Sequence, residues 1–238
     1  MTNAFLRALD HCAEAGKPVR LWLRDDDAVV PSPALNQLLA MTDGLPVTLA
    51  VIPAFSGQAL ADRLADAPGV GVAVHGWSHA NHAPAGEKKQ ELGPHRPVAQ
   101  VLADLARGHA HLHALYGPRL VPVLVPPWNR VAPGVASALP GIGFRALSVF
   151  GPAKPAPLPL INTHVDPIDW HGTRSARPIT VLLDEMAVAV KAGGPVGVLT
   201  HHLVHDAAIW EFLAQLFAMT RGHPGCRWVA LPDLIQDA

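Results

Sequence analysis

The chain has 238 residues, 50% of them hydrophobic and 16% charged, which suits one barrel-sized domain and excludes a disordered chain. Its 18 lysine and arginine residues nearly balance 19 aspartate and glutamate residues, so a net charge of −1 argues against binding of nucleic acid through its phosphates. No apolar run reaches the ~18 residues that cross a bilayer, and Asp10, His11 and Glu14 stand where an export signal would be apolar. We therefore expect a cytoplasmic protein with one domain over residues 1–238, and two cysteines predict no disulfide framework.

Helical periodicity and short apolar runs alternate along the chain, punctuated by 24 prolines. The first part predicts a helix at 3–15, a strand at 19–23, a helix at 33–42, a strand at 47–52, a helix at 57–66 and a strand at 70–74. A polar stretch at 76–96 precedes a helix at 97–115, a strand at 121–125, a short helix at 133–138 and strands at 144–149 and 159–163. The last part predicts a helix at 178–192, a strand at 196–200, a helix at 206–220 and a strand at 228–231.

This alternation of strands and helices predicts a parallel sheet with right-handed crossovers. Seven or eight strands in a chain of this length favour a closed or nearly closed (β/α) barrel, and an open doubly wound sheet is the alternative. The proline-rich residues 151–159 are predicted to form a surface loop.

Polar residues cluster directly after five of the predicted strands. These clusters are Asp25-Asp26-Asp27, His75 with His79, Pro126-Pro127-Trp128-Asn129-Arg130, Asp166 with Asp169-Trp170, and Thr200-His201-His202. The carboxyl ends of parallel strands meet on one face of a barrel or open sheet, and ligands bind there. We therefore expect the five clusters to form one site.

Two of these clusters contain the residue types that bind transition metals. Adjacent aspartates repel one another, and a bound cation relieves that repulsion, although aspartates also cap helices. Gly76 allows a tight turn that brings the imidazoles of His75 and His79 to one point. Two imidazoles and a carboxylate are the ligand set of catalytic zinc sites, which keep a fourth position for water, and they also suit cobalt, nickel or iron.

Other histidines are given different roles by their surroundings. His109, His111 and His113 fall within the helix at 97–115 and are predicted to lie on a partly exposed face. His82 follows His79 by three residues, and we expect it to support the metal ligands from behind. Phosphate-binding glycine loops and the G-x-S-x-G nucleophile motif are absent, so covalent serine chemistry is not expected.

Taken in order, the five clusters resemble the motifs of the polysaccharide deacetylase family, the NodB-homology domain of family 4 carbohydrate esterases. The family's T-F-D-D-G and H-[ST]-x-x-H motifs correspond to Arg24-Asp25-Asp26-Asp27-Ala28 and His75-Gly76-Trp77-Ser78-His79. Its R-x-P-[YW] motif corresponds to Val125-Pro126-Pro127-Trp128, which lacks the arginine. Its D-x-x-D-W and L-x-H motifs are matched in full by Asp166-Pro167-Ile168-Asp169-Trp170 and Leu199-Thr200-His201.

The resemblance implies a single-domain distorted (β/α) barrel with about seven parallel strands, and a divalent metal, most often zinc. By position, the resemblance makes Asp27, His75 and His79 the metal ligands. It also makes Asp26 the general base, and His201 the general acid, paired with Asp169.

Two of these assignments stay open at the level of the sequence. In the family the arginine of the third motif holds the base carboxylate, and Arg24 or Arg130 is the candidate to replace it here. Three consecutive aspartates also allow Asp25 as base and Asp26 as ligand. In a regular strand the side chains of Asp25 and Asp27 lie on the same side. The aspartate that is neither base nor ligand therefore either adds a charge near the site or faces away from it.

The predicted function is hydrolysis of the amide of an N-acetylated carbohydrate, or of a related amide, by metal-activated water. Trp128, Asn129, Arg130 and Trp170 are expected to contact the substrate, with the Trp128 amide as a hydrogen-bond donor to the developing oxyanion. A cytosolic substrate, such as a lipid-linked or nucleotide-linked amino sugar, is expected rather than a wall polymer. The alternatives are a carbohydrate-binding pseudo-enzyme of the same fold and a metal-dependent phosphoesterase.

Overall fold

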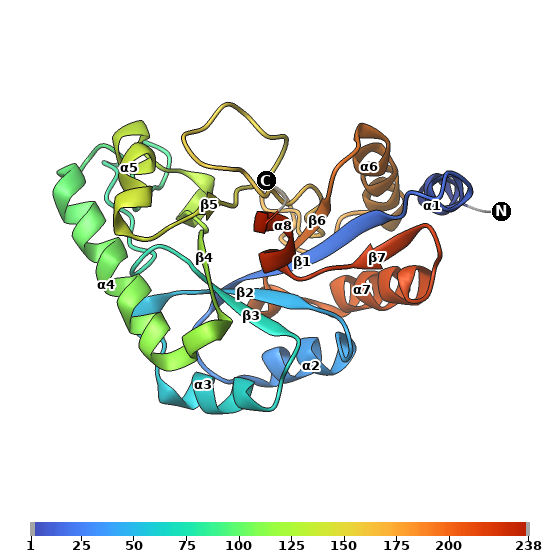
Figure 1. Ribbon diagram of the computed structural model, residues 1–238, viewed down its shortest axis with the longest axis horizontal. Coiled ribbons are helices and arrows are strands. Elements are labelled where there is room, and N and C mark those ends of the chain that lie inside the picture. Colours follow the sequence, from blue (N-terminus) through green and yellow to red (C-terminus); the bar gives the residue numbers. More distant parts are fainter. Residues whose placement is uncertain (1–2, 237–238) are drawn as a thin grey trace.

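The computed structural model describes residues 3–236, in which seven parallel strands form one curled sheet (Figure 1). The strands are β1 (Val19–Ala28), β2 (Val47–Val51), β3 (Val70–Val74), β4 (Leu120–Leu124), β5 (Ala146–Leu147), β6 (Val196–Thr200) and β7 (Cys226–Trp228). Their order is β5-β4-β3-β2-β1-β6, and β7 pairs with the first residues of β1, next to the segment of β1 that pairs with β6.

Helices connect the strands and cover the outside of the sheet (Figure 1). They are α1 (Ala4–Glu14), α2 (Pro33–Met41), α3 (Gln58–Ala65), α4 (Val98–Tyr116), α5 (Pro133–Ala138), α6 (Ile179–Ala192), α7 (Ala207–Thr220) and α8 (Leu231–Gln236). Side chains cap three of them, because Asn3, Ser32 and Asp206 each accept a hydrogen bond from the amide three residues later. Within residues 3–236, no helix is both long and apolar enough to span a membrane.

An irregular segment closes the gap between the two edges of the sheet. Residues 160–165 form isolated parallel bridges, from Leu160 to Leu147 at the end of β5 and from Val165 to Val198 in β6. The arrangement confirms the distorted (β/α) barrel and contradicts the open doubly wound sheet. A strand at 159–163 is wrong, because the segment makes only single bridges, and the expected strand at 144–149 is reduced to Ala146–Leu147.

The two faces of β1 have different neighbours, as strand alternation requires. Leu21 and Leu23 pack into the large core between sheet and helices, whereas Trp22 belongs to a second core inside the barrel. Small side chains such as Ala50 and Ala73 leave room for Trp22 in that interior. Continuing the alternation, Arg24 and Asp26 point to the interior, at the carboxyl end of the barrel.

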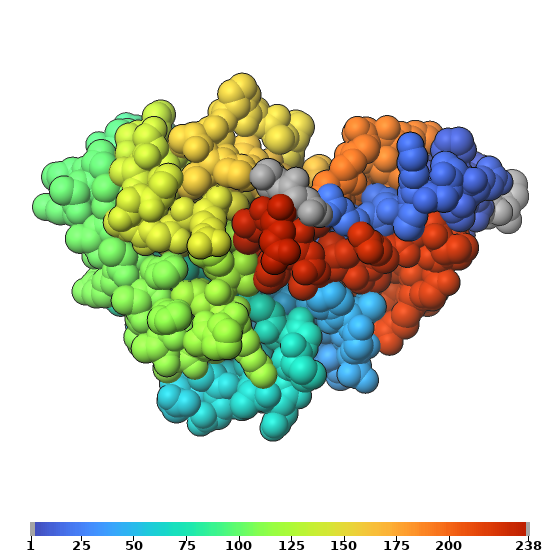
Figure 2. All heavy atoms as spheres, viewed as in Figure 1, coloured from blue at the N-terminus to red at the C-terminus, as the bar shows by residue number. Residues whose placement is uncertain are grey.

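The last elements of the chain close the opposite end of the barrel. The final strand is β7 at Cys226–Trp228, earlier than the predicted 228–231, because Cys226 is in register with Val19 at the start of β1. Helix α8, which the sequence analysis did not predict, follows and places Leu231 and Leu234 in the inner core. Figure 2 shows α8 in dark red in the middle of this face, between the blue N-terminal segment and the yellow-green middle of the chain.

Candidate functional site

A cleft of about 670 Å³ opens at the carboxyl end of the barrel. Its walls include residues from all five predicted clusters, which confirms that these distant segments share one face. The predicted site residues that line it are Asp26, Asp27, His75, His79, Trp128, Asn129, Arg130, Asp169, Trp170 and His201. Arg24, Asp25 and His82 do not line it.

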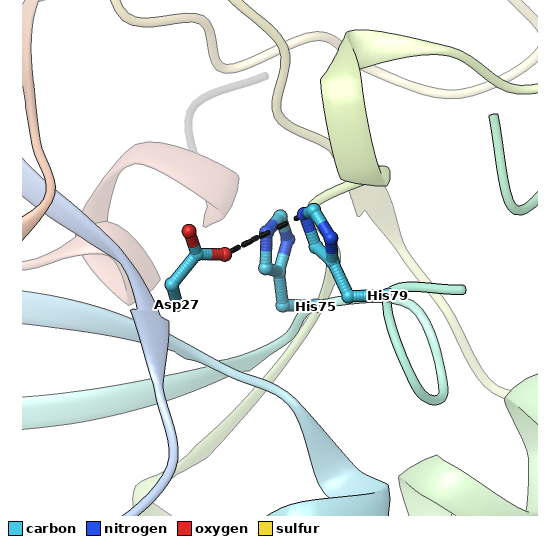
Figure 3. Close-up of side chains that lie close together, drawn as sticks. All are labelled: Asp27, His75 and His79. Atoms are coloured by element: carbon cyan, nitrogen blue, oxygen red, sulfur yellow. Dashed lines mark hydrogen bonds and ion pairs between the residues drawn. The ribbon is translucent and has the colours of Figure 1, made fainter. Parts of the chain in front are cut away.

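Asp27, His75 and His79, which line this cleft, lie close together (Figure 3). The Asp27 carboxylate points toward both rings, with its Oδ1 atom 3.1 Å from Nε2 of His75 and 3.5 Å from Nε2 of His79. Potential ligand atoms of the three residues all lie within 4.8 Å of one another. Nδ1 of His75 donates a hydrogen bond to the Val125 carbonyl at 2.8 Å, which orients the ring with Nε2 toward Asp27. One carboxylate oxygen and two imidazole nitrogens fit a divalent metal such as zinc.

The charges of this cluster are strongly coupled. Burial disfavours ionised Asp27, but its hydrogen bond with His75 and the nearby histidine charges outweigh burial and lower its pKa. Burial likewise opposes protonation of His75, but the aspartates outweigh it and raise its pKa. The pKa of His79 is lowered by burial and by His75, so this ring is neutral at neutral pH, as a metal ligand must be.

A buried carboxylate that sequence reasoning missed holds the loop carrying His79. Glu91 accepts hydrogen bonds from the amides of Trp77 (3.1 Å), Ser78 (2.8 Å) and His79 (3.1 Å). The loop turns at Gly76, whose φ is +62°, and a Cβ atom there would lie 2.1 Å from Oε2 of Glu91. The expected tight turn at Gly76 is therefore present. No spacing rule connects Glu91 to the histidines, so the sequence carried no signal for it.

Arg24 holds Asp26 through two hydrogen bonds. Nε of Arg24 lies 2.8 Å from one Asp26 oxygen and Nη2 lies 3.0 Å from the other, and Arg24 is fully buried. Its remaining nitrogen, Nη1, donates to Oγ of Ser148 at 2.7 Å. Arg130 instead donates to the carbonyl of Lys89 at 2.8 Å. Of the two arginines that could replace the missing one, the structure selects Arg24.

Asp25 is turned away from the cleft and anchors the end of β6. Its carboxylate accepts hydrogen bonds from Oγ1 of Thr200 (2.7 Å) and the His202 amide (2.9 Å), and lies 2.5 Å from Nδ1 of His202. The side chains of Asp25 and Asp27 do not have the same neighbours, as they would in a regular strand. The reason is an irregularity in β1: its pairing with β2 shifts between Asp25 and Ala28, and Asp27 has a φ of +68°. The alternative register, with Asp25 as base and Asp26 as ligand, does not fit this arrangement.

The predicted pair of Asp169 and His201 is not formed. The exposed Asp169 carboxylate accepts hydrogen bonds from the amides of Gly172 and Thr173, both at 3.0 Å, and so stabilises its own turn. Asp166, to which the sequence assigned no role, is buried. Its carboxylate accepts a hydrogen bond from Nε1 of Trp170 at 2.7 Å. Burial raises the pKa of Asp166, while the Ile168 amide and the charge of His201 oppose that rise.

His201 and the predicted substrate-contacting residues form the remaining walls of the cleft. The His201 ring packs edge-on against Trp170, with centroids 4.7 Å apart, and Trp128 lies 4.2 Å from His79 by the same measure. Trp128 has a φ of +54°, and within residues 3–236 its amide has no hydrogen-bond partner in the protein. Oδ1 of Asn129 accepts the Phe150 amide at 2.9 Å and so ties the loops after β4 and β5 together.

The expectation for His82 is wrong. Its ring is on the surface, where Nε2 lies 3.3 Å from Nη1 of Arg96. Most of residues 81–89 are exposed, and proximity in sequence to His79 does not bring His82 behind Asp27, His75 and His79. His109, His111 and His113 lie in α4 on partly exposed faces, as expected.

Comparisons with known proteins identify the fold. No protein-family profile and no curated protein sequence matches the chain. Among solved structures, a putative polysaccharide deacetylase from Mycobacterium smegmatis matches with a TM-score of 0.68 and 18% identity, over 93% of this chain and 90% of that one. A family 4 acetyl xylan esterase from Clostridium thermocellum in complex with a cobalt ion matches with a TM-score of 0.55 and 16% identity, over 91% and 90% of the two chains.

A further similar structure is a mutant of a family 4 pseudoenzyme with restored enzymatic activity, with a TM-score of 0.62 and 16% identity. This match covers 92% of the present chain and 68% of the pseudoenzyme. All these identities are low, so what they show is shared architecture. The chain has the fold of the family 4 carbohydrate esterases and polysaccharide deacetylases.

Proposed function

We propose that the protein is a metal-dependent hydrolase that removes an acyl group, typically acetyl, from an N-acetylated carbohydrate or related amide. The observation that carries the proposal is that Asp27, His75 and His79 share one cleft with Asp26 and His201. These side chains supply a ligand set, a proton acceptor and a proton donor within a single concave site. The fold that the chain shares with family 4 carbohydrate esterases and polysaccharide deacetylases supports the same function.

The metal would be held by one Asp27 oxygen and the Nε2 atoms of His75 and His79. Zinc fits this donor set best, and cobalt, nickel or iron are compatible with it; the similar acetyl xylan esterase was solved with cobalt. When bound, such an ion supplies Lewis acidity, which polarises a carbonyl and lowers the pKa of water from 15.7 toward ~7.

Asp26 is assigned as the general base. Arg24 fixes both of its oxygens from one side, and each oxygen keeps a further lone pair that can accept a proton from the attacking water. Arg24 lies in β1 two residues before Asp26 and holds its carboxylate. This is the role that the resemblance gives to the arginine missing from the third motif. This replacement argues against a pseudo-enzyme.

His201 is assigned as the general acid that protonates the leaving amine. Its Nδ1 is buried without a hydrogen-bond partner in residues 3–236, which leaves Nε2 as the ring atom to face substrate. Asp166, rather than Asp169, supports this ring, because it accepts a hydrogen bond from Nε1 of Trp170, whose indole packs against His201.

The Trp128 amide is assigned as the donor to the substrate carbonyl oxygen. Pro127 has no amide hydrogen, and those of Asn129 and Arg130 donate to the Pro126 and Pro127 carbonyls, so Trp128 is the free donor of this turn. The indole rings of Trp128 and Trp170 line the same cleft and offer flat apolar faces to a sugar ring or an acetyl methyl group.

The proposal is tested by measuring acetate release from a panel of N-acetyl sugars together with metal content. We expect about one equivalent of divalent metal per chain, and acetate release that stops on chelation and returns when zinc or cobalt is added. Full activity of the chelated protein would contradict metal dependence. Release of phosphate from phosphomonoesters without acetate release would favour the phosphoesterase instead.

A further inference from the structure

The cleft is lined by three cationic side chains that have no acidic partner. Lys89, Arg130 and Arg174 all contribute to its wall. Among residues 3–236 none of the three forms an ion pair, whereas the fourth cation of the wall, Arg177, lies 2.9 Å from an oxygen of Glu185. Charged groups at a binding cleft without a counter-ion favour a ligand of opposite charge.

The carboxylates of the cleft are already engaged by other groups. Asp26 forms an ion pair with Arg24, and Oδ1 of Asp27 lies 3.1 Å from Nε2 of His75 and 3.5 Å from Nε2 of His79. Asp166 accepts hydrogen bonds from Trp170 and a backbone amide, and Asp169 from two backbone amides. Within residues 3–236, none of these carboxylates forms an ion pair with Lys89, Arg130 or Arg174.

The loop structure keeps two of the cations at the same edge. Nη1 of Arg130 donates to the backbone carbonyl of Lys89 at 2.8 Å, which ties the loop after β4 to the segment after β3. Both side chains are cationic and line the cleft, so an anion bound at this edge would be attracted by both. The guanidinium of Arg174 lies over the Trp170 ring, 5.8 Å from its centre, with its hydrogen-bond donors available to a ligand.

We propose that the substrate carries an anionic group, a phosphate or a carboxylate, which Lys89, Arg130 and Arg174 bind while the acylated nitrogen lies at the metal centre. This inference rests on the proposed function and narrows its substrate class to acidic N-acyl sugars. The volume of about 670 Å³ accommodates a sugar with such a substituent. Guanidinium groups bind phosphate and carboxylate alike through paired hydrogen bonds. The experiment therefore compares a sugar phosphate with a sugar carboxylate.

The test compares kcat/KM for acetate release from N-acetylglucosamine, N-acetylglucosamine 1-phosphate and N-acetylmuramic acid. At least one acidic sugar should exceed the neutral one by about tenfold or more, as charge-assisted hydrogen bonds predict. Which acidic sugar is preferred distinguishes phosphate from carboxylate. Arg130→Gln and Arg174→Gln should each lower the acidic-to-neutral ratio by about tenfold, and higher salt should lower it further.

Lys88→Gln is the matched control, because Lys88 neighbours Lys89 but is exposed and does not line the cleft. It should leave the ratio unchanged. Equal rates for the three sugars, with acetate released from all, would overturn this inference and leave the proposed function standing.

If no sugar releases acetate, the proposed function fails. Anion recognition is then tested separately, by calorimetric measurement of the binding of the two acidic sugars to metal-loaded protein. Binding that Arg130→Gln weakens about tenfold would support the inference. Absent binding, or binding that the substitution does not change, would overturn it.

Discussion

At the scale of single residues, Arg24 is the side chain that most constrains the chemistry of the site. It is fully buried, and its charge is balanced by Asp26, which is itself only 5% exposed. A planar guanidinium satisfies both carboxylate oxygens at once and still reaches Ser148, which an ammonium cannot do. Orientation of the proposed base therefore depends on one side chain two residues before it in the strand.

Arg24→Lys should retain the charge and lose the paired hydrogen bonds. We expect acetate release to fall by about tenfold to a hundredfold, with metal content unchanged, because the base is misoriented and the ligands are not touched. Arg24→Met should also destabilise the fold by about 3–5 kcal/mol, because it leaves Asp26 buried and unpaired. Kinetics, elemental analysis and urea unfolding measure the three quantities, and unchanged kinetics in Arg24→Lys would contradict the assignment.

Substitution of the proposed base and of a metal ligand should have separable effects. Asp26→Asn should lower the rate by about 10²–10⁴-fold with metal still bound, because only proton transfer is removed. His75→Ala should lose metal and activity together. His82→Ala is the control, since this histidine is on the surface and should keep both metal content and rate. Loss of metal from Asp26→Asn would show that the two aspartates have been assigned in the wrong order.

The grouping of Asp27, His75 and His79 could be predicted from the sequence, and the residues that support this group could not. His75 and His79 follow β3 and the aspartates lie at the end of β1, so the rule that carboxyl ends of parallel strands converge brings them together. The sequence left open which aspartate faces the histidines, because that depends on the irregular backbone at Asp27. Glu91 and Ser148 act only through contacts made in the folded chain, with no fixed spacing to the residues they hold. The pairing of Asp169 with His201 failed for a related reason, because a local turn offers that carboxylate two nearer amide donors.

At the scale of elements, the loop after β3 places His79 beside Asp27 and His75. Glu91 gathers three consecutive amides around one carboxylate, and Gly76 makes room for that carboxylate. Because Glu91 is only 1% exposed, its removal would leave those donors without partners in a buried place. The conformation of this loop is therefore stabilised by contacts within the protein.

Gly76→Ala and Gly86→Ala test this loop with matched backbone strain. Both glycines have positive φ, but a Cβ atom would meet Glu91 at Gly76 and nothing within 4 Å at Gly86. Gly86→Ala should cost about 1 kcal/mol and leave metal affinity unchanged. Gly76→Ala should in addition weaken metal affinity by about tenfold to a hundredfold, as loss of support for a ligand does. Equal metal affinities of the two variants, measured by competition with a chelator, would show that Glu91 does not position His79.

Most helices and the central strands could be predicted because their periodicity is local, whereas three features depend on distant pairing. β1 runs on to Ala28 through three aspartates, because β2 and β6 supply partners on both sides and Arg24 and His202 bind two of the acidic side chains. Residues 159–163 fail to become a strand between β5 and β6, and α8 forms where the inner core needs an apolar cover.

At the scale of the whole molecule, the barrel joins a cleft at one end to an apolar closure at the other. The stability of the fold should depend on pH through the half-buried His205. Burial lowers the pKa of His205 to about 4, with the charges of His202 and His201 acting in the same direction and that of Asp25 opposing it. The folded state therefore keeps this ring neutral at a pH where the unfolded chain already binds a proton. Its contribution to stability is present above pH ~6.5 and is lost as the pH falls toward 4.

His205→Gln should flatten the pH dependence of unfolding in this window. Wild-type protein should lose up to about 3 kcal/mol of its free energy of unfolding through this group between pH 6.5 and pH 4, and the variant should lose correspondingly less. Urea unfolding of both proteins at several pH values in this interval measures the difference. Parallel curves would show that His205 is not the residue responsible.

The central claim is that segments from β1 and from the loop after β3 bind one metal ion at the mouth of the barrel. Anomalous scattering from crystals of the full chain loaded with cobalt or zinc tests it most directly. We predict one strong peak about 2.0–2.2 Å from an Asp27 oxygen and from Nε2 of both His75 and His79. Crystals of the metal-loaded protein whose anomalous peak lies elsewhere, with these three side chains making no contact to it, would contradict the account.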